Sequence, residues 1–112
     1  MDDDQEFYVK ILKKNVRLPL ERWIHITEAH PELKEFEKNI LEEIKTPKNV
    51  YYSASSDYYI LVQPMAHFIT DNIILYIKLL AEDAFVISAH PISDKRLKRK
   101  ITQWKKLTPL SE

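Results

Sequence analysis

The hydrophobic pattern of the chain changes its period near Thr46 and Pro47. Between Pro19 and this point, apolar residues recur at intervals of three and four, the spacing of one face of a helix. After it come short runs rich in β-branched and aromatic residues, which are typical of strands. Helices followed by strands predict an α+β fold. With 112 residues, the chain has the size of one domain with one hydrophobic core, so we expect a single domain over residues 1–112.

The first half of the chain predicts one short strand and a bent pair of helices. Residues 6–13 alternate between apolar and polar side chains, which indicates a strand. The spacing that follows predicts a helix over about residues 19–29. Pro31 ends this helix because it disfavours helical geometry at His30, and it begins a second helix that ends at Thr46. The inward-facing residues of the two helices are Leu20, Trp23, Ile24, Thr27, Leu33, Phe36, Ile40, Leu41 and Ile44.

The second half predicts strands and a last helix. The expected strands cover residues 50–54, 58–63, 73–80 and 85–89, with polar turns between them that favour an antiparallel meander. Pro64 closes the second strand or places it at an edge, because proline has no amide hydrogen. Ser93 and Asp94 are helix-capping residues and predict a basic helix over about residues 93–107, with Leu97, Ile101 and Trp104 inward. The predicted fold is therefore an N-terminal strand and two helices packed on a four-stranded antiparallel meander, followed by a basic C-terminal helix.

The composition excludes several classes of function. The chain has no glycine, and phosphate-cradling loops need glycine where the backbone approaches the ligand, so P-loop and dinucleotide-binding motifs are absent. It has no cysteine, which removes disulfides, thiol nucleophiles and thiolate metal sites. No apolar run approaches the roughly 20 residues that cross a bilayer, and the acidic start MDDDQEF is the reverse of a secretory signal. We expect a soluble, cytoplasmic protein that does not interact with membranes.

The formal net charge of zero hides an asymmetry between the two ends of the chain. An acidic segment over about residues 1–6 contains Asp2, Asp3, Asp4 and Glu6. The predicted last helix contains the cations Lys95, Arg96, Lys98, Arg99, Lys100, Lys105 and Lys106. A basic segment of this density attracts phosphates, and it is also typical of a helix face in solvent. Lys98, Arg99 and Lys100 are the candidate phosphate contacts.

Two histidines and an arginine lie close together on the first predicted helix. Arg22 and His25 are three residues apart, so they are neighbours on the helix surface. His30 is five residues beyond His25, about 140° around a regular helix, but the break at Pro31 frees its side chain to turn back. Cleavage of a phosphodiester without a metal needs a base, an acid and a cation, and histidine and arginine suit these roles.

Two other interpretations of this cluster stay open. From spacing alone, the favoured interpretation is that His25 and His30 are partly buried histidines that bond to nearby carboxylates or carbonyls. They are also potential zinc ligands, but their spacing is not the i, i+4 spacing that places two ligands on one helical face. We therefore expect no metal site and no other cofactor.

Further candidates lie in the predicted strands. Ser88 and His90 are two residues apart, hence on the same face of the last strand, and Pro91 is expected to end its pairing. His67 lies in a predicted loop and has no partner pattern. The tyrosines of the first two expected strands either stack on nucleic-acid bases or pack across strands; these are Tyr51, Tyr52, Tyr58 and Tyr59, with Tyr59 as the candidate substrate contact.

The order of these motifs resembles a known family. The run ERWIHITEAHPEL, a helix ending in IKTPKNVYYS, and then NIILYIKLL and AFVISAHP look like the small bacterial and phage proteins of the barnase, EndoU, colicin and RelE-like nuclease superfamily, often called the BECR fold. The resemblance covers about residues 9–92. It implies an RNA-directed nuclease, typically the toxin of a toxin and antitoxin pair or an effector of phage conflict. RNA and a cognate antitoxin are then the expected partners.

The resemblance also implies roles for single residues. Those that match are Arg22, His25 and His30 for the helix motif, Glu32 for the HPE motif, and Ser88 for a threonine or serine of the last strand. His90 stands where the family more often has a tyrosine, and the turn before the last strand lacks the glycine that relatives commonly have. The presence of His90 leaves open which residue is the general acid, and the missing glycine affects the geometry of the turn.

The expected reaction is attack of a ribose 2′-hydroxyl on the adjacent phosphate, which gives a cyclic phosphate. His25 or His30 is the base, the other or His90 is the acid, and Arg22 holds the phosphate. A metal is not required because the substrate carries its own nucleophile. Two further hypotheses remain: a non-catalytic module that binds nucleic acid or protein through residues 93–107, and self-association of the acidic start with the basic end.

Overall fold

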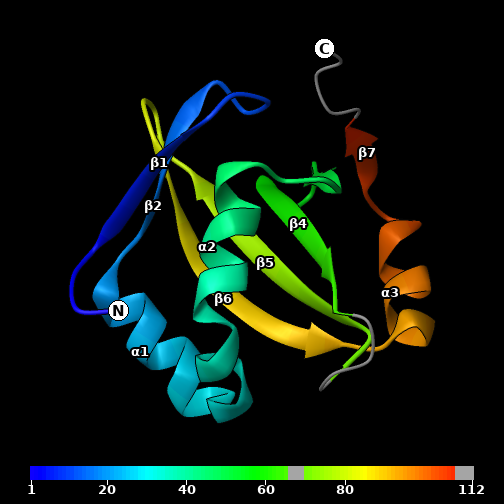
Figure 1. The fold of residues 1–112 in the computed structure, drawn as a ribbon. Helices are drawn as coiled ribbons and strands as arrows, with labels where there is room; N and C mark the ends of the chain where they lie inside the picture. Colours follow the sequence, from blue (N-terminus) through cyan, green and yellow to red (C-terminus); the bar gives the residue numbers. More distant parts are fainter. Residues whose placement is uncertain (66–69, 108–112) are drawn as a thin grey trace.

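The structure, a computed structural model, describes residues 1–65 and 70–107 (Figure 1). In chain order its elements are β1 (Gln5–Val9), β2 (Lys14–Leu18), α1 (Leu20–Ala29), the 3₁₀ helix η1 (Pro31–Phe36), α2 (Glu37–Lys45), β3 (Val50–Ser53), β4 (Tyr58–Pro64), β5 (Asn72–Leu79), β6 (Ala84–Ile92), α3 (Asp94–Ile101) and β7 (Lys105–Leu107). α1 coincides with the helix predicted over residues 19–29. The second predicted helix is divided into η1 and α2.

The described strands form one mixed sheet in the order β1-β2-β6-β5-β4-β3-β7. The prediction of a four-stranded antiparallel meander is therefore wrong, although the class is α+β. β3 to β6 do pair antiparallel with each other in sequence order. The hairpin of β1 and β2 was not predicted, nor was β7, which occupies the end of the region predicted as a helix over residues 93–107. α3 ends at Ile101 because residues 105–107 pair with β3.

The strand predicted over residues 6–13 is interrupted by a tight turn. β1 ends at Val9, and Lys13, with a φ of 55°, reverses the chain into β2, which pairs antiparallel with β1. The amide of Leu12 donates to the carbonyl of Val9 at 3.1 Å, and Leu12 is buried. Lysine carries no sequence signal for positive φ, and the middle of the turn holds the apolar residues Ile11 and Leu12. The alternating pattern therefore continues through a chain reversal.

β6 changes neighbours along its length. Near its start it pairs in parallel with β2, where Val16 lies opposite Ala84, and beyond that point its strand neighbour is β5 alone. It also runs through Pro91 to Ile92, so the expectation that Pro91 ends the pairing is wrong. Pro91 is tolerated because the free edge of β6 has no ladder that needs its missing amide hydrogen.

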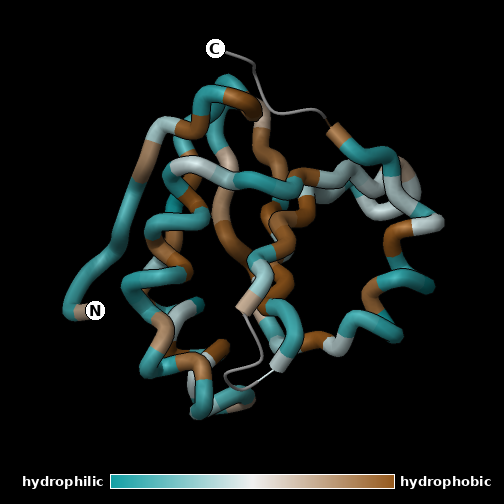
Figure 2. Tube along the Cα trace, turned by 45° about the vertical axis from the view of Figure 1, so that its right-hand side comes forward, coloured by the Kyte–Doolittle hydropathy of each residue, from teal (hydrophilic) through white to brown (hydrophobic). Residues whose placement is uncertain are grey.

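Two hydrophobic cores lie on opposite faces of the sheet. α1, η1 and α2 cover the larger one, to which they contribute Trp23, Ile26, Leu33, Ile40 and Ile44. α3 and the turn after it cover the smaller one, where Leu97 and Trp104 pack against the strand residues Ile60, Val62, Ile74 and Ile92. Figure 2 shows hydrophobic residues along the middle strands and hydrophilic ones along much of the helices. The predicted inward residue Ile24 is instead 48% exposed.

The acidic start of the chain takes part in the fold. Asp4 lies just before β1, and its carboxylate accepts a hydrogen bond of 2.8 Å from the amide of Leu20, in the first turn of α1. This contact satisfies one of the amides that a helix start leaves without an intrahelical partner. Among the residues that the structure describes, no helix combines the length and the apolar character needed to span a bilayer.

Candidate active site

The structure brings His30 and His90 together from distant parts of the sequence. His30 ends α1: its amide still donates to the carbonyl of Ile26, but its φ of −135° and ψ of 75° leave the helix because Pro31 follows. His90 lies on β6, against which α1 packs. The centroids of the two imidazole rings are 6.2 Å apart, with the planes tilted by 41°.

Tyr76 joins the pair from the neighbouring strand. His90 lies opposite Ile74 in the register of β5 and β6, and Tyr76 lies opposite Ser88, so these side chains share the face of the smaller core. The Tyr76 hydroxyl oxygen is 3.3 Å from Nε2 of His90, and the two ring centroids are 5.6 Å apart. His30, His90 and Tyr76 therefore form a continuous cluster, which we call the imidazole cluster.

Hydrogen bonding defines the proton position on neutral His90. Nδ1 of His90 is 2.9 Å from the carbonyl oxygen of Pro91, and because a carbonyl only accepts, Nδ1 carries the hydrogen. Nε2 then keeps its lone pair and accepts the hydrogen bond from Tyr76. Burial raises the pKa of Tyr76, which keeps its hydroxyl protonated and able to donate.

The surroundings of His90 favour its neutral form. Burial lowers the pKa of His90, and the positive charges of His30, Lys100 and Arg96 lower it further, while the hydrogen bond to Pro91 acts in the opposite direction. A half-buried, neutral imidazole whose Nε2 lone pair only accepts a hydrogen bond is suited to accept a proton.

His30 has a different environment. Its side chain is 36% exposed, and Oε2 of Glu32 is 3.9 Å from its Nδ1. The carboxylate is in position to pair with the protonated imidazole. Glu32, expected as a substrate contact, thus lies beside a histidine of the imidazole cluster.

Two cations of α3 act electrostatically on the imidazole cluster. Arg96 and Lys100 are four residues apart and so neighbour each other on the helix surface, and both act electrostatically on His90. Lys100, a predicted phosphate contact, belongs to this pair. Lys98 and Arg99, the other two predicted contacts, are exposed on α3. Ser93 caps the helix as predicted, since its side chain accepts a hydrogen bond from the amide of Arg96.

The other candidates on α1 have no contact with the imidazole cluster. His25 is exposed and Arg22 is half-buried, and in the described part of the chain the side chain of neither makes a hydrogen bond or an ion pair. Trp23, Ile26 and Thr27 are the buried residues of this helix. Ser88 lies on the same face as His90, as predicted, and is half-buried.

The tyrosines of β3 and β4 pack against other aromatic rings. Tyr59 lies against the larger core, on the face opposite His90, and its ring centroid is 5.5 Å from that of Tyr52. On the other face, Tyr51 contacts Trp104 at 5.9 Å and Tyr58 contacts Tyr76 at 6.5 Å. Cross-strand and helix packing thus describes their present contacts. His67 lies outside the described residues.

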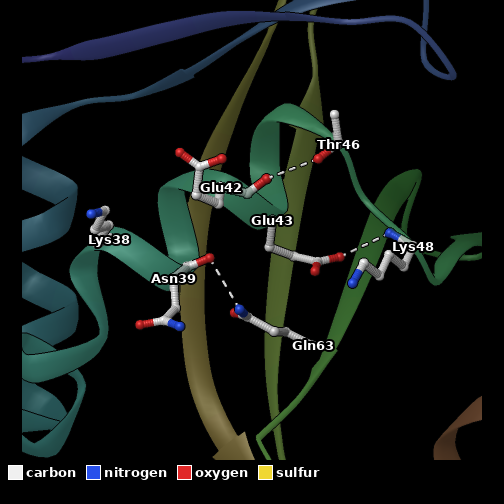
Figure 3. A pocket seen from close by; sticks show the side chains of 7 residues that line it. All are labelled: Lys38, Asn39, Glu42, Glu43, Thr46, Lys48 and Gln63. Atoms are coloured by element: carbon white, nitrogen blue, oxygen red, sulfur yellow. Dashed lines mark hydrogen bonds between the residues drawn. The ribbon is translucent and has the colours of Figure 1, made fainter.

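One cavity lies away from the imidazole cluster, between α2 and β4 (Figure 3). It has a volume of about 340 Å³ and is lined by Lys38, Asn39, Glu42, Glu43, Thr46, Lys48 and Gln63. The carboxylate of Glu43 points inward and accepts a hydrogen bond of 3.0 Å from the amide of Lys48. Burial raises the pKa of Glu43. Because no histidine or aromatic ring lines this cavity, it offers none of the groups assembled at the imidazole cluster.

Sequence analysis missed two residues of the site, Tyr76 and Arg96. The alternation of NIILYIKL places Tyr76 on the same strand face as Ile74, but the partner strand and its register decide that this face carries His90. Arg96 was recognised only as one of several basic residues. Within residues 1–65 and 70–107, no three His, Asp or Glu side chains gather closely enough to hold a metal ion.

Comparisons with protein-family models, with curated proteins and with solved structures find no match.

Proposed function

We propose that this protein is a cytoplasmic endoribonuclease that cleaves RNA by attack of a ribose 2′-hydroxyl on the adjacent phosphate, without a metal cofactor. The observation that carries the proposal is the pairing of His30 with His90 at 6.2 Å between ring centroids. Two imidazoles at this separation can act on opposite sides of one phosphate, one as base and the other as acid. The substrate brings its own nucleophile, so proton transfer and charge stabilisation are the tasks left to the protein.

His90 is the base in this proposal. Its Nε2 lone pair now accepts from Tyr76, and the 2′-hydroxyl replaces that donor when RNA binds. Nε2 takes the hydroxyl proton as O2′ forms a bond to phosphorus. The lowered pKa of His90 keeps the imidazole neutral, and hence competent as a base, near neutral pH.

His30 is the acid. Paired with Glu32 at 3.9 Å, it enters the reaction as the imidazolium and gives its proton to O5′ as the bond between phosphorus and O5′ breaks. The products are a 2′,3′-cyclic phosphate and a 5′-hydroxyl. Arg96 and Lys100 supply the positive charge that balances the phosphate in the transition state. They take the role that sequence analysis assigned to Arg22.

The test is cleavage of a single-stranded RNA oligonucleotide by purified protein in the presence of EDTA. We expect a cyclic phosphate product, and no cleavage of the matching DNA, which lacks the 2′-hydroxyl. His30→Ala and His90→Ala should each lower kcat/KM by about 10²–10⁴-fold, the usual contribution of a general acid or base. Cleavage of DNA at the same rate, or complete loss of activity in EDTA, would contradict the mechanism.

His25→Ala separates this arrangement from the one expected from sequence. His25 is exposed and makes no described contact with the imidazole cluster, so its replacement should cost less activity than that of His30 or His90. A loss as large as for His90→Ala would restore the pair His25 and His30 as the catalytic residues.

A role as the toxin of a toxin and antitoxin pair is part of the proposal, and the sequence resemblance supports it. Expression in bacteria should arrest growth and degrade total RNA, and His90→Ala should abolish both effects. Normal growth and intact RNA with soluble parent protein would argue against a toxin.

The exposed basic surface favours one alternative, a binding module without catalysis. Lys95, Arg96, Lys98 and Arg99 are all exposed on α3. If this surface alone carries the function, joint replacement of Lys98 and Arg99 by alanine should abolish RNA retention in a gel while His30→Ala and His90→Ala leave it intact. Phosphate contacts of this kind also weaken as salt rises.

A further inference from the structure

A second, smaller cavity opens next to the imidazole cluster, between α3 and the strands β3 to β5. Its volume is about 220 Å³, and its lining residues are Ser53, Ser55, Ser56, Tyr58, Ile60, Tyr76, Lys100, Gln103 and Trp104. We call it the aromatic pocket. Unlike the larger cavity beside α2, it has three aromatic rings in its wall.

The aromatic pocket shares a wall with the imidazole cluster. Tyr76 lines the pocket and also bonds His90 at 3.3 Å. Its other neighbour is Tyr58, at 6.5 Å between ring centroids and nearly edge-on. The rings of His30, His90, Tyr76 and Tyr58 thus follow one another from the end of α1 into the pocket. A molecule seated there is one side chain away from the proposed base.

The remaining lining residues supply polar groups of both kinds. Lys100 offers donors only, whereas the amide of Gln103 and the serine hydroxyls offer donors and acceptors. Ser53 and Ser55 place their hydroxyl oxygens 3.4 Å apart. Flat aromatic walls with donors and acceptors nearby suit a planar ring that carries polar groups on its edge. A nucleobase has both properties, and its stacking on aromatic rings tolerates any sequence.

We propose that the aromatic pocket binds one unpaired base of the RNA, next to the phosphate that is cleaved. The base stacks on Trp104 or Tyr58, and Lys100 and Gln103 contact its edge. The identification of the ligand as the base of a substrate rests on the proposed nuclease function. The position of the pocket beside His90 then predicts that the enzyme selects single-stranded RNA, because a paired base is not free to enter.

The fluorescence of Trp104 gives a binding test that needs no cleavage. Adenosine, guanosine, cytidine and uridine 3′-monophosphates are titrated against the His90→Ala protein, with ribose 5-phosphate as the probe without a base. At least one nucleotide should change the emission with saturation, and ribose 5-phosphate should not. Trp104→Phe should remove the signal although Trp23, buried in the larger core, still emits. Equal responses to ribose 5-phosphate and to the nucleotides would overturn the proposal.

Rim variants test the pocket without disturbing the core. Gln103 is exposed at its edge, so Gln103→Ala should keep the fold and weaken nucleotide binding. Lys100→Ala should weaken it as well, whereas Lys105→Ala, a matched loss of charge outside the pocket, should not. For Tyr58→Ala we expect a loss of roughly 5- to 150-fold, the equivalent of ~1–3 kcal/mol for one stacked base. Equal losses from Lys100→Ala and Lys105→Ala would reduce the effect to general charge and contradict the pocket.

The two proposals fail in different ways. Nucleotide binding that depends on Trp104, in a parent protein that leaves RNA intact, would refute the nuclease and leave the pocket standing. Cleavage of RNA by a protein that binds no nucleotide, with equal kcat/KM on oligonucleotides carrying an abasic site on either side of the scissile phosphate, would refute the pocket and leave the nuclease standing.

Discussion

Tyr76 donates a hydrogen bond of 3.3 Å to Nε2 of His90 across the antiparallel strands β5 and β6. The other nitrogen of His90 donates to the carbonyl of Pro91 at 2.9 Å. These two bonds hold the imidazole in one orientation and in one tautomer. The ring is therefore oriented for proton transfer by its own strand and by the neighbouring one.

Tyr76→Phe tests this relationship. The hydroxyl stabilises the neutral form of His90, so its loss should raise the pKa of His90 and move the low-pH limb of the cleavage profile to higher pH. The free energy of unfolding should fall by about 0.5–1.5 kcal/mol, the net contribution of one hydrogen bond. The pH dependence of kcat/KM and denaturant unfolding measure the two effects. Tyr8→Phe is the control, because Tyr8 is 62% exposed. A purely structural tyrosine would lower stability without moving the pH profile.

The titration of His90 should be visible in the unmodified protein. Burial and nearby positive charge lower its pKa, so NMR should give His90 a midpoint below the ordinary value of about 6.5. The unfolded chain then binds more protons than the folded one between these two pKa values. Stability should fall as the pH decreases through this window, and His90→Asn should remove that part of the fall. A midpoint for His90 above 6.5 would contradict the assignment of His90 as the base.

Glu43 predicts a pH effect of the opposite sign in the larger cavity. Burial raises its pKa in the folded protein, so the folded state binds more protons, and stability should fall as the pH rises from the ordinary value of the carboxyl to the raised one. Glu43→Gln should remove this fall, because glutamine cannot ionise and its oxygen still accepts from the amide of Lys48. Thermal unfolding between pH 4 and 8 measures it. Glu42→Gln, at an exposed carboxyl of the same helix, should leave the slope unchanged.

In the turn between β1 and β2, we expect glycine at position 13 to give a more stable protein than alanine. Lys13 has a φ of 55°, which costs an ordinary L-residue about 1–2 kcal/mol, whereas glycine adopts it freely. Lys13→Gly should therefore be more stable than Lys13→Ala, by up to about 1 kcal/mol after the greater freedom of unfolded glycine is subtracted. At Lys10, which has no positive φ, the order of the same two variants should be reversed. Chemical denaturation of the four variants decides the matter.

The sequence was sufficient for the elements that have periodic patterns. α1 and α2 follow the helical spacing that buries Trp23, Ile40 and Ile44, and β3 to β6 follow the strand-rich runs. The hairpin of β1 and β2 was not predicted, because its turn uses lysine in place of glycine or asparagine. β7 was not predicted, because the formation of a three-residue strand depends more on the edge of β3 with which it pairs than on its own composition.

The candidate site was predictable only in its residue types. The helix break at His30 and the face of His90 follow from Pro31 and from strand alternation. Their meeting depends on β6 lying beside β2 and under α1, which local sequence does not encode. His25 was favoured because it is close to His30 in sequence, yet the imidazole that lies against His30 comes from the other half of the chain.

The parallel pairing of β2 with β6 has a consequence for how the protein is made. Val16 cannot meet Ala84 until the chain through β6 has left the ribosome, and β7 must still reach back to β3. Such long loops close slowly, because the chain loses conformational entropy before the stabilising contacts form. His30 and His90 therefore cannot meet before β6 has been synthesised. Under the proposed nuclease function, a nascent chain without β6 has no assembled site with which to attack the messenger or the ribosomal RNA.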